Sequence, residues 1–472
     1  MRGRSKAGRP IAAAAAAAFT ATLALSQGVR ADTLDWALVQ AYQNNPQLNA
    51  QRAALRSQDE AVPQALSGYR PSVSLTASVG TENQSTLSKA STSAGPVYIG
   101  TESTFTPHGV GITAQQTLFN GYQTANKTRQ AEAQVSAGRA TLAVTEETVL
   151  LNAATAYMNL IRDSAILELQ RKNVEVLQEQ LRQTRDRFNV GEVTRTDVAQ
   201  AESRLAAGRA QVLSAESNYV SSKAVYRQVI GVEAGTLAAA SPVDRFSPKT
   251  LAESVTTGRA LNPSVAAAMF GIDVAALQVK INEGALAPKV TATASVQQQW
   301  EINTSTQLQQ FNASLVGQVT VPIYQGGAEY SLVRQSKETL GQQRISLDTA
   351  RDQVQAQVVQ SWGQLEAAKA QIQATQAQVN SAEIALNGVR EEARVGQRTT
   401  LDVLNAQQEL VNARVALVTA QHDRVVASYS LLSSVGGLSV QQLGLKTSVY
   451  DPMVHYQQVR DRWGGLRTPD GR

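Results

Sequence analysis

The sequence predicts a mainly α-helical chain that is duplicated internally and carries four β-strands. The Val190-Gly191 dipeptide recurs 205 residues later as Val395-Gly396, within two segments of similar sequence. Residues 108–241 and 323–451 contain no proline, as long uninterrupted helices require, since proline removes a backbone donor. Four shorter segments alternate apolar and polar residues, which is the pattern of strands.

The two halves differ by one insertion. Upstream of the long helices the offset is 217 residues, because Asn45-Pro46 corresponds to Asn262-Pro263 and Pro71 to Pro288. Twelve additional residues therefore lie in the first half, between Pro71 and Gly121. A duplication on this scale predicts two copies of one structural plan.

The first 31 residues are typical of a secretory signal peptide. A basic start is followed by an apolar stretch from Ile11 to Leu25 and by the small-residue site Val29-Arg30-Ala31. Without these residues the chain has 38 basic and 38 acidic side chains, so its charge gives no indication of nucleic-acid binding. Past the signal we expect no transmembrane helix, because no apolar run approaches 18 residues.

Residues 72–79, 108–118, 289–296 and 312–323 are expected to form two β-hairpins with long exposed loops, the first of which contains the insertion. Strands of this kind can cross an outer membrane, although a soluble sheet with one wet face has the same alternation. Four strands cannot close a barrel, and an open sheet edge cannot face lipid. If the strands lie in a membrane, two or three copies must share one barrel of 8 or 12 strands.

The helical segments show a seven-residue apolar repeat, which predicts coiled-coil packing. In the second half it comprises Val358, Leu365, Ile372, Val379 and Leu386. Long helices are expected over residues 122–188 and 328–394, and half-length helices over 33–68, 197–230, 252–286 and 402–435. A soluble antiparallel coiled-coil rod would show the same periodicity, but strand pairs inserted at the same point of both repeats argue against it.

At this point the chain resembles the TolC-like outer-membrane efflux proteins over essentially its whole mature length. The resemblance is carried by these ordered segments: Val321-Pro322-Ile323-Tyr324-Gln325-Gly326-Gly327, Ala154-Thr155-Ala156-Tyr157, Arg187-Phe188-Asn189-Val190-Gly191 followed by Thr196-Asp197-Val198, and Val395-Gly396-Gln397-Arg398-Thr399-Thr400-Leu401-Asp402-Val403-Leu404.

The resemblance implies a homotrimer in the outer membrane of a Gram-negative bacterium, extending into the periplasm. Each protomer would give four strands to a 12-stranded β-barrel and its helices to a periplasmic tunnel. The implied function is an exit duct for drug efflux or type I protein secretion, with a periplasmic adaptor and an inner-membrane transporter as partners. The alternative function is a soluble periplasmic adaptor or scaffold protein.

This plan divides the chain into consecutive regions. They are a signal peptide (1–31), periplasmic helices (32–71), the first barrel hairpin (72–118), a long helical hairpin (119–231), an equatorial linker (232–251), the second set of periplasmic helices (252–288), the second barrel hairpin (289–323), the second long helical hairpin (324–436), and an equatorial segment with a loose tail (437–472).

The two Val-Gly turns are expected at the periplasmic tip, with Gly191 and Gly396 as helix C-caps. The resemblance implies a gate there, formed by Thr196, Asp197, Arg398 and Asp402. Ala393 and Asn405 stand where the family pattern has a gate Tyr and a second ring Asp. The residues alone leave a second role open for the two aspartates, because Thr194-x-x-Asp197 and Thr399-x-x-Asp402 match capping boxes, and capping and gating are compatible.

Nothing in the sequence predicts catalysis. There is no Cys, and His108, His422 and His455 are scattered without metal-ligand spacing. We find no nucleophile motif, so we expect no enzyme activity, metal or cofactor.

Overall fold

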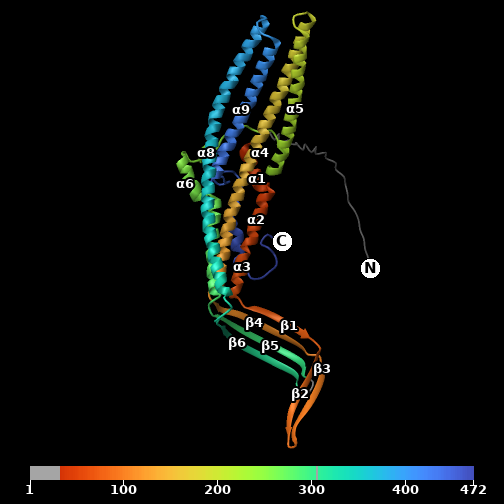
Figure 1. Cartoon of the computed structure of the whole chain (residues 1–472), viewed down its shortest axis with the longest axis vertical. Helices are drawn as coiled ribbons and strands as arrows, with labels where there is room; N and C mark the ends of the chain where they lie inside the picture. Colours follow the sequence, from red (N-terminus) through yellow and green to blue (C-terminus); the bar gives the residue numbers. More distant parts are fainter. Residues whose placement is uncertain (1–31, 304–306, 472) are drawn as a thin grey trace, which may run out of the picture.

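The computed structural model describes residues 32–303 and 307–471, so the expected signal peptide at 1–31 lies outside the described residues. The molecule is elongated (Figure 1). A layer of long helices forms one end, a four-stranded sheet follows at an angle, and a β-hairpin extends beyond the sheet.

Two helices of 67 residues run the length of the helical layer: α4 (Gln123–Asn189) and α8 (Ala328–Arg394). Each is about 100 Å long at ~1.5 Å per residue. The shorter helices α5 (Arg195–Ile230) and α9 (Thr400–Ser434) pack antiparallel along the half of α4 and α8 farthest from the sheet. These bounds lie within two residues of the helices that the seven-residue repeat predicts.

The other half of each long helix is covered by shorter pieces. These are α1 (Leu34–Asn44), α2 (Pro46–Asp59), α3 (Ala61–Leu66) and the 3₁₀ turn η1 (Ser67–Tyr69) in the first repeat, and α6 (Leu251–Leu261) and α7 (Pro263–Gly284) in the second. The expectation of continuous helices over 33–68 and 252–286 was therefore wrong.

Both interruptions occur at an Asn-Pro pair. Asn45 and Asn262 have extended backbones, and each side chain accepts a hydrogen bond from the first turn of the helix that follows. Pro46 and Pro263 disfavour the helical conformation in the residue before them and suit the first position of a new helix. The equivalence of the two pairs in the repeat thus marks the same helix break in both halves.

One helical stretch, Leu251–Gly284, is long and apolar enough to cross a membrane by length and composition alone. This differs from the expectation that no such segment exists. In the structure the stretch is divided at Asn262, and α7 packs against both α4 and α8. Its place is therefore within the helical layer.

The four expected membrane strands are β1 (Ser72–Val79), β4 (His108–Asn120), β5 (Lys289–Asn303) and β6 (Gln307–Thr320). They form one antiparallel sheet in the order β1-β4-β5-β6. The sheet begins and ends with strands that have only one neighbour. The order brings the strands of both repeats together, with β4 and β5 pairing at the centre.

The register separates an apolar face from a polar face. Aligned across all four strands are the row Leu75, Ile112, Val296 and Ala313 and the row Val73, Ala114, Ala294 and Leu315. On the opposite face the row Ser74, Thr113, Ser295 and Ser314 is aligned in the same way.

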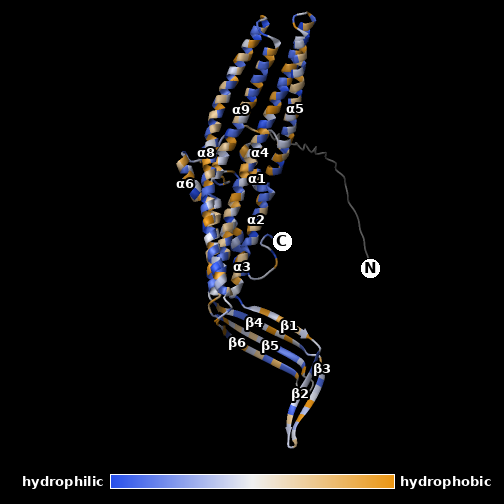
Figure 2. Ribbon diagram, viewed as in Figure 1, coloured by the Kyte–Doolittle hydropathy of each residue, from blue (hydrophilic) through white to orange (hydrophobic). Residues whose placement is uncertain are grey.

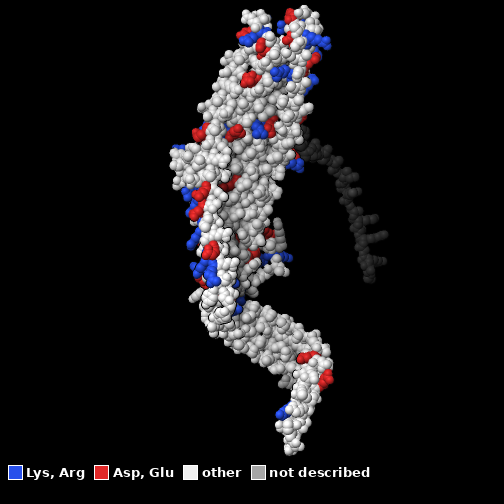
Figure 3. Space-filling view, viewed as in Figure 1, with Lys and Arg blue, Asp and Glu red and all other residues white. Residues whose placement is uncertain are grey.

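The strands accordingly show alternating hydropathy along their length (Figure 2). Within the described strands the sheet carries only two charged residues, Lys289 and Glu301, both near strand ends. Lys, Arg, Asp and Glu are instead concentrated on the helices and their tip, with a few on the distal hairpin (Figure 3). A sheet with one apolar face, one polar face and no central charge fits a membrane barrel wall.

The connection between β1 and β4 is a second hairpin. The sequence predicts an exposed loop here, but β2 (Glu82–Thr92) and β3 (Gly95–Phe105) pair along eleven positions. The loop prediction was wrong because Ser- and Thr-rich segments accept strand geometry once the backbone groups of a partner segment are available. The insertion in the first repeat thus lengthens a β-ribbon beyond the sheet.

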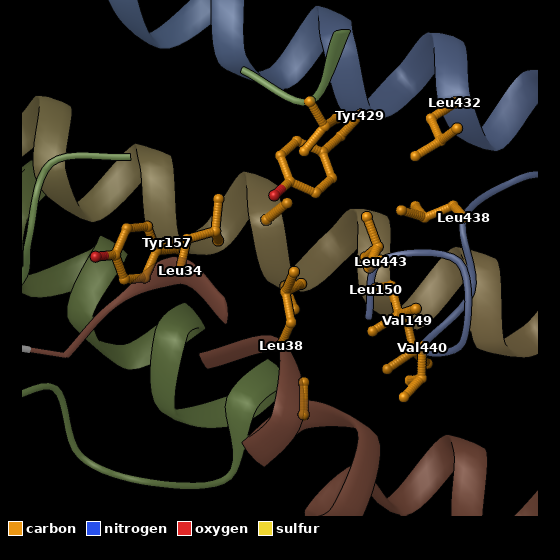
Figure 4. Packing of buried hydrophobic residues seen from close by; sticks show 14 of the residues in the cluster. Leu34, Leu38, Val149, Leu150, Tyr157, Tyr429, Leu432, Leu438, Val440 and Leu443 are labelled. Atoms are coloured by element: carbon orange, nitrogen blue, oxygen red, sulfur yellow. The ribbon is translucent and has the colours of Figure 1, made fainter. Parts of the chain in front are cut away.

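The main core lies at the middle of the helical layer. Residues from α1, α4, α5, α8 and α9 meet the linker after α5 and the segment after α9. Figure 4 shows Leu38 and Leu150 beside Leu438, Val440 and Leu443, which come from the segment after α9. The hydroxyl of Tyr157 on α4 lies 2.7 Å from the carbonyl oxygen of Asp32 and 2.6 Å from that of Ala238. Asp32, the first expected mature residue, is thereby held to the linker.

The end of the chain differs from the loose tail that the sequence predicts. Residues Pro452–Val459 form a helix, α10, that packs on α2. His455 Nδ1 lies 2.8 Å from Oδ2 of the buried Asp59. Arg460 Nη2 lies 3.5 Å from Glu132 Oε1 on α4. These contacts are between residues hundreds of positions apart, so local sequence does not indicate them.

Two neighbouring carboxyl groups lie beneath the segment after α9. Glu146 on α4 accepts a hydrogen bond of 3.0 Å from the backbone N–H of Val440. Burial and, to a smaller extent, the charge of the adjacent Glu146 raise the pKa of Glu147 to about 8, although a hydrogen bond from the Leu438 backbone acts in the opposite direction. Glu147 is only 8% exposed and therefore holds its proton in the folded protein at neutral pH.

We expect Glu147→Gln to make stability less dependent on pH. Unfolded Glu ionises near pH ~4.3, whereas folded Glu147 ionises near 8. The contribution of Glu147 to the free energy of unfolding therefore falls as pH rises between these two values. Thermal unfolding midpoints of the purified protein at pH 5 and pH 8 should differ less in Glu147→Gln than in wild type. The exposed Glu175→Gln on the same helix is the control. Equal pH dependence in all three proteins would contradict the assignment.

Candidate gate at the helical tip

The two tip turns have the same backbone geometry. Gly191 and Gly396 have φ of +82° and +79°, the left-handed conformation that favours glycine. The N–H of Glu192 bonds to the carbonyl of Arg187 and that of Gln397 to Glu392, each at 2.9 Å. This six-to-one pattern is a Schellman motif, and it ends α4 and α8. The C-cap residues are Val190 and Val395, and the glycines occupy the next position, one residue later than the sequence predicts.

Both capping boxes are confirmed. The Thr194 hydroxyl accepts a hydrogen bond from the Asp197 N–H, and the Asp197 carboxylate accepts one from the Thr194 N–H at 2.9 Å. Thr399 and Asp402 repeat the arrangement at the start of α9, also at 2.9 Å. Each box satisfies donors at a helix end that otherwise lack partners.

These bonds lower the pKa of both aspartates. For Asp197 the largest cause is the hydrogen bond from the Thr194 hydroxyl, followed by that from its backbone. For Asp402 the backbone N–H of Thr399 is the largest cause, and Arg398 contributes by its charge. Because the folded pKa is depressed, each cap is complete above the unfolded pKa of ~3.9 and is lost as pH falls through the folded value.

Arg398 pairs within its own hairpin. Its Nε lies 2.8 Å from Oε2 of Glu392, near the end of α8. The first hairpin has a corresponding local pair, in which Arg187 Nε lies 3.0 Å from Glu192 Oε2. Thr196 is exposed. The protomer thus places Thr196 and Asp197 on one hairpin and Arg398 and Asp402 on the other, without bringing Arg398 to a carboxylate across the gap.

The hairpins are joined by contacts that the sequence does not reveal. Leu404 on α9 is 3% exposed and belongs to an apolar cluster whose other buried members are Leu177, Leu181, Ala201 and Leu205, all from α4 and α5. Burying a leucine contributes roughly 1.5–3 kcal/mol. Leu404 is therefore a stronger link between the hairpins than an exposed polar pair.

Two polar contacts flank this cluster. Arg204 Nη2 on α5 donates to Asn405 Oδ1 on α9 at 2.8 Å. Gln407 Nε2 donates to Asn173 Oδ1 on α4 at 3.4 Å, while its Oε1 accepts from Arg390 at 3.0 Å. Asn405 is one of the two positions at which the resemblance implies a departure from the family pattern, and in the structure it contacts the other hairpin.

Differences between the repeats could have indicated this link. Subtracting 205 from Leu404 gives Ala199, which is exposed. Subtracting it from Gln407 gives Glu202, which binds Arg185 at 2.6 Å just as Gln407 binds Arg390. Glutamate only accepts hydrogen bonds, whereas the Gln407 amide donates to Asn173 of the other hairpin while its oxygen accepts from Arg390. Repeat positions that differ in chemistry thus mark where the hairpins touch.

No group of three or more His, Cys, Asp or Glu side chains that could hold a metal occurs within residues 32–303 and 307–471. The polar groups at the tip are engaged in caps, local ion pairs and the two contacts between hairpins. This arrangement holds the two helical hairpins together.

Removing each cap should loosen only its own helix. We expect Asp197→Ala to accelerate amide hydrogen exchange in the first turn of α5, and Asp402→Ala to do so in the first turn of α9, because each carboxylate accepts from one N-cap N–H. Each variant is the control for the other. Mass-spectrometric exchange that accelerates in both helices, or in neither, would contradict independent caps.

The fold is shared with solved outer-membrane channels. The Campylobacter jejuni CmeC outer membrane channel superposes with a TM-score of 0.76 over 90% of this chain and 89% of that chain, at 16% identity. This likeness establishes the fold of the helices and sheet described above.

Sequence comparison gives closer relatives. The chain is 42% identical to the outer membrane efflux protein BepC of Brucella suis over 97% of both chains. It is 27% identical to the outer membrane protein TolC of Vibrio cholerae over 89% of this chain and 94% of that protein. The outer membrane efflux protein family matches residues 37–232 and 257–437, one stretch in each half of the duplication. The chain therefore belongs to the outer membrane efflux protein family and is an efflux or secretion channel of the Gram-negative outer membrane that extends into the periplasm.

Proposed function

We propose that three copies of this chain form one duct, with a 12-stranded barrel in the outer membrane and a tunnel of helices in the periplasm. The observation that carries the proposal is the open sheet, in which β1 and β6 each have one paired and one unpaired edge. Unpaired backbone groups are too costly in lipid to remain exposed, so β1 of one copy must pair with β6 of the next.

The number of copies follows from the size of the barrel. Two copies would give about eight strands, whose interior is just wide enough to be filled by side chains. Three copies give 12 strands and a wider lumen, lined by the polar face of the sheet. A duct that passes cargo requires this wider lumen.

The duct works with partners at its periplasmic end. The resemblance to the family implies a periplasmic adaptor and an inner-membrane transporter. The exposed tip offers a surface for such a contact, since Val190 and Val395 at the turns are 71% and 74% exposed. Cargo enters at this tip and leaves through the barrel. Comparison of a deletion strain with its parent, in drug sensitivity and in secreted proteins, distinguishes efflux from type I secretion.

The tip is the gate of the duct. In this proposal Gly191 and Gly396 shape its turns, and Thr196, Asp197, Arg398 and Asp402 line the constriction of the closed trimer. Three copies of Asp402 around the axis would attract cations.

The contacts of Leu404 and Arg204 hold the two hairpins of each protomer together. Apolar burial at Leu404 supplies more of this closure than exposed charge pairs, which are individually weak. Opening therefore requires separation of α9 from α4 and α5, and adaptor binding must supply the free energy.

The first prediction of this proposal concerns assembly. The mature protein should fractionate with outer membranes and have three times the protomer mass in mild detergent, as measured by light scattering with correction for bound detergent. A water-soluble monomer would contradict the proposed duct. A dimer would contradict the proposed 12-stranded barrel, because two copies supply only eight strands.

The second prediction of this proposal concerns gating. Arg204→Ala and Leu404→Ala should each raise the conductance of the purified pore in planar bilayers, because each removes a contact between the hairpins. Arg398→Ala should also raise it if Arg398 lines the closed gate. Arg209→Ala, an exposed charge removal on the same helix as Arg204, is the control. Unchanged conductance in a variant would exclude its residue from the gate.

A further inference from the structure

A cavity of about 590 Å³ that is open to solvent lies between the first helices and the end of the chain. It is lined by residues of α1, α2, the segment before α10, α10 itself and the last residues of the chain. Four of its side chains determine its chemistry: Tyr42, Arg52, Arg56 and Tyr450. The proposed duct and gate use none of them.

Arg52 is held between two aromatic rings. Its Cζ lies 4.3 Å from the ring centroid of Tyr42 and 5.2 Å from that of Tyr450, which are cation–π distances. Its Nη1 donates to Asn49 Oδ1 at 2.9 Å, whereas its buried Nη2 has no hydrogen-bond partner. Within the described residues Arg52 belongs to no ion pair of 4.0 Å or less. The guanidinium is thus fixed in position close to Glu146, where burial raises the pKa of the carboxyl and the charge of Arg52 counteracts that rise.

The walls of the cavity are fixed by hydrogen bonds between distant segments. The Tyr450 N–H donates to the Tyr42 hydroxyl at 2.9 Å, and Gln43 Nε2 donates to Thr447 Oγ1 at 2.8 Å. The contact of His455 with Asp59 holds α10 against α2. A site held in place in this way loses little conformational entropy when it binds a ligand.

The chain itself places a carboxylate in this cavity. Arg56 is one helical turn beyond Arg52, and its Nε lies 3.7 Å from Oδ2 of Asp470 in the tail. The two side chains are 27% and 51% exposed, so this long ion pair is screened and readily displaced. The other acid at the cavity, Asp451, accepts a hydrogen bond from the Met453 N–H and caps α10.

We propose that this cavity binds a carboxylate-bearing peptide segment of a periplasmic partner protein, in the place that Pro469 and Asp470 occupy here. Arg56 contacts the incoming carboxylate, Arg52 adds positive charge behind it, and Asp470 of the tail acts as an intramolecular competitor for Arg56. The cavity volume is in the range of ligand sites, and a peptide segment of the chain, Pro469 and Asp470, already forms part of its lining. The proposal does not depend on the number of copies in the barrel or on the gate.

The test uses the detergent-solubilised full chain and a labelled, end-blocked peptide Thr-Pro-Asp-Gly, the sequence of residues 468–471, with Thr-Pro-Asn-Gly as the neutral probe. Fluorescence anisotropy should show binding of the acidic peptide only. Asp470→Asn should bind it at least threefold more tightly than wild type, because the competing carboxylate is gone. Equal binding of the two peptides, or no binding to Asp470→Asn, would overturn the proposal.

Further substitutions, combined with Asp470→Asn, identify the contacts. Arg56→Gln and Arg52→Gln should each weaken binding about tenfold, whereas Lys446→Gln, an exposed charge removal nearby, should not. Unchanged affinity in Arg56→Gln, whose side chain is partly exposed and whose loss should not disturb folding, would refute the site. Acetate should displace the peptide at high concentration. Displacement by inorganic phosphate but not by acetate would show a phosphate site instead.

Discussion

The backbone hydrogen bonds at the two outer edges of the sheet are the constraint on which the rest of the structure depends. Within one protomer β1 and β6 each lack a neighbour on one side. In water such edges would be solvated, but in a membrane they must be paired. A ring of copies is the arrangement that pairs every edge. In the proposed duct this symmetry would place the helices beneath the sheet in a ring as well.

The two repeats act as one body because they share a single core. The cluster at the middle of the helical layer includes residues from α4 and α8 and from both connecting segments. The first residues of the mature chain and the segment after α9 are anchored there through the Tyr157 hydroxyl and the backbone of Val440. The sheet and the tip therefore extend from a common rigid region, and movement at the tip need not disturb the membrane strands.

Function at the tip arises where the repeats have diverged. The turns, C-caps and capping boxes are the same in both hairpins, and they stabilise each hairpin separately. Leu404 in place of an alanine, and Gln407 in place of a glutamate, supply the contacts that join one hairpin to the other. Shared positions thus serve the local fold, whereas divergent positions serve the contact between the hairpins.

The sequence by itself determined the duplication, the long helices, the four strands of the sheet and both capping boxes, because each depends on periodicity or on residues within a few positions of one another. It did not reveal the helix breaks at Asn45 and Asn262 or the β2–β3 hairpin, where local patterns were ambiguous.

Only the tertiary structure decided that Arg398 binds Glu392, that Leu404 enters the opposite hairpin and that α10 docks on α2. These outcomes depend on which side chains the folded helices bring within contact distance, and that depends on the packing of the whole layer rather than on spacing along the chain.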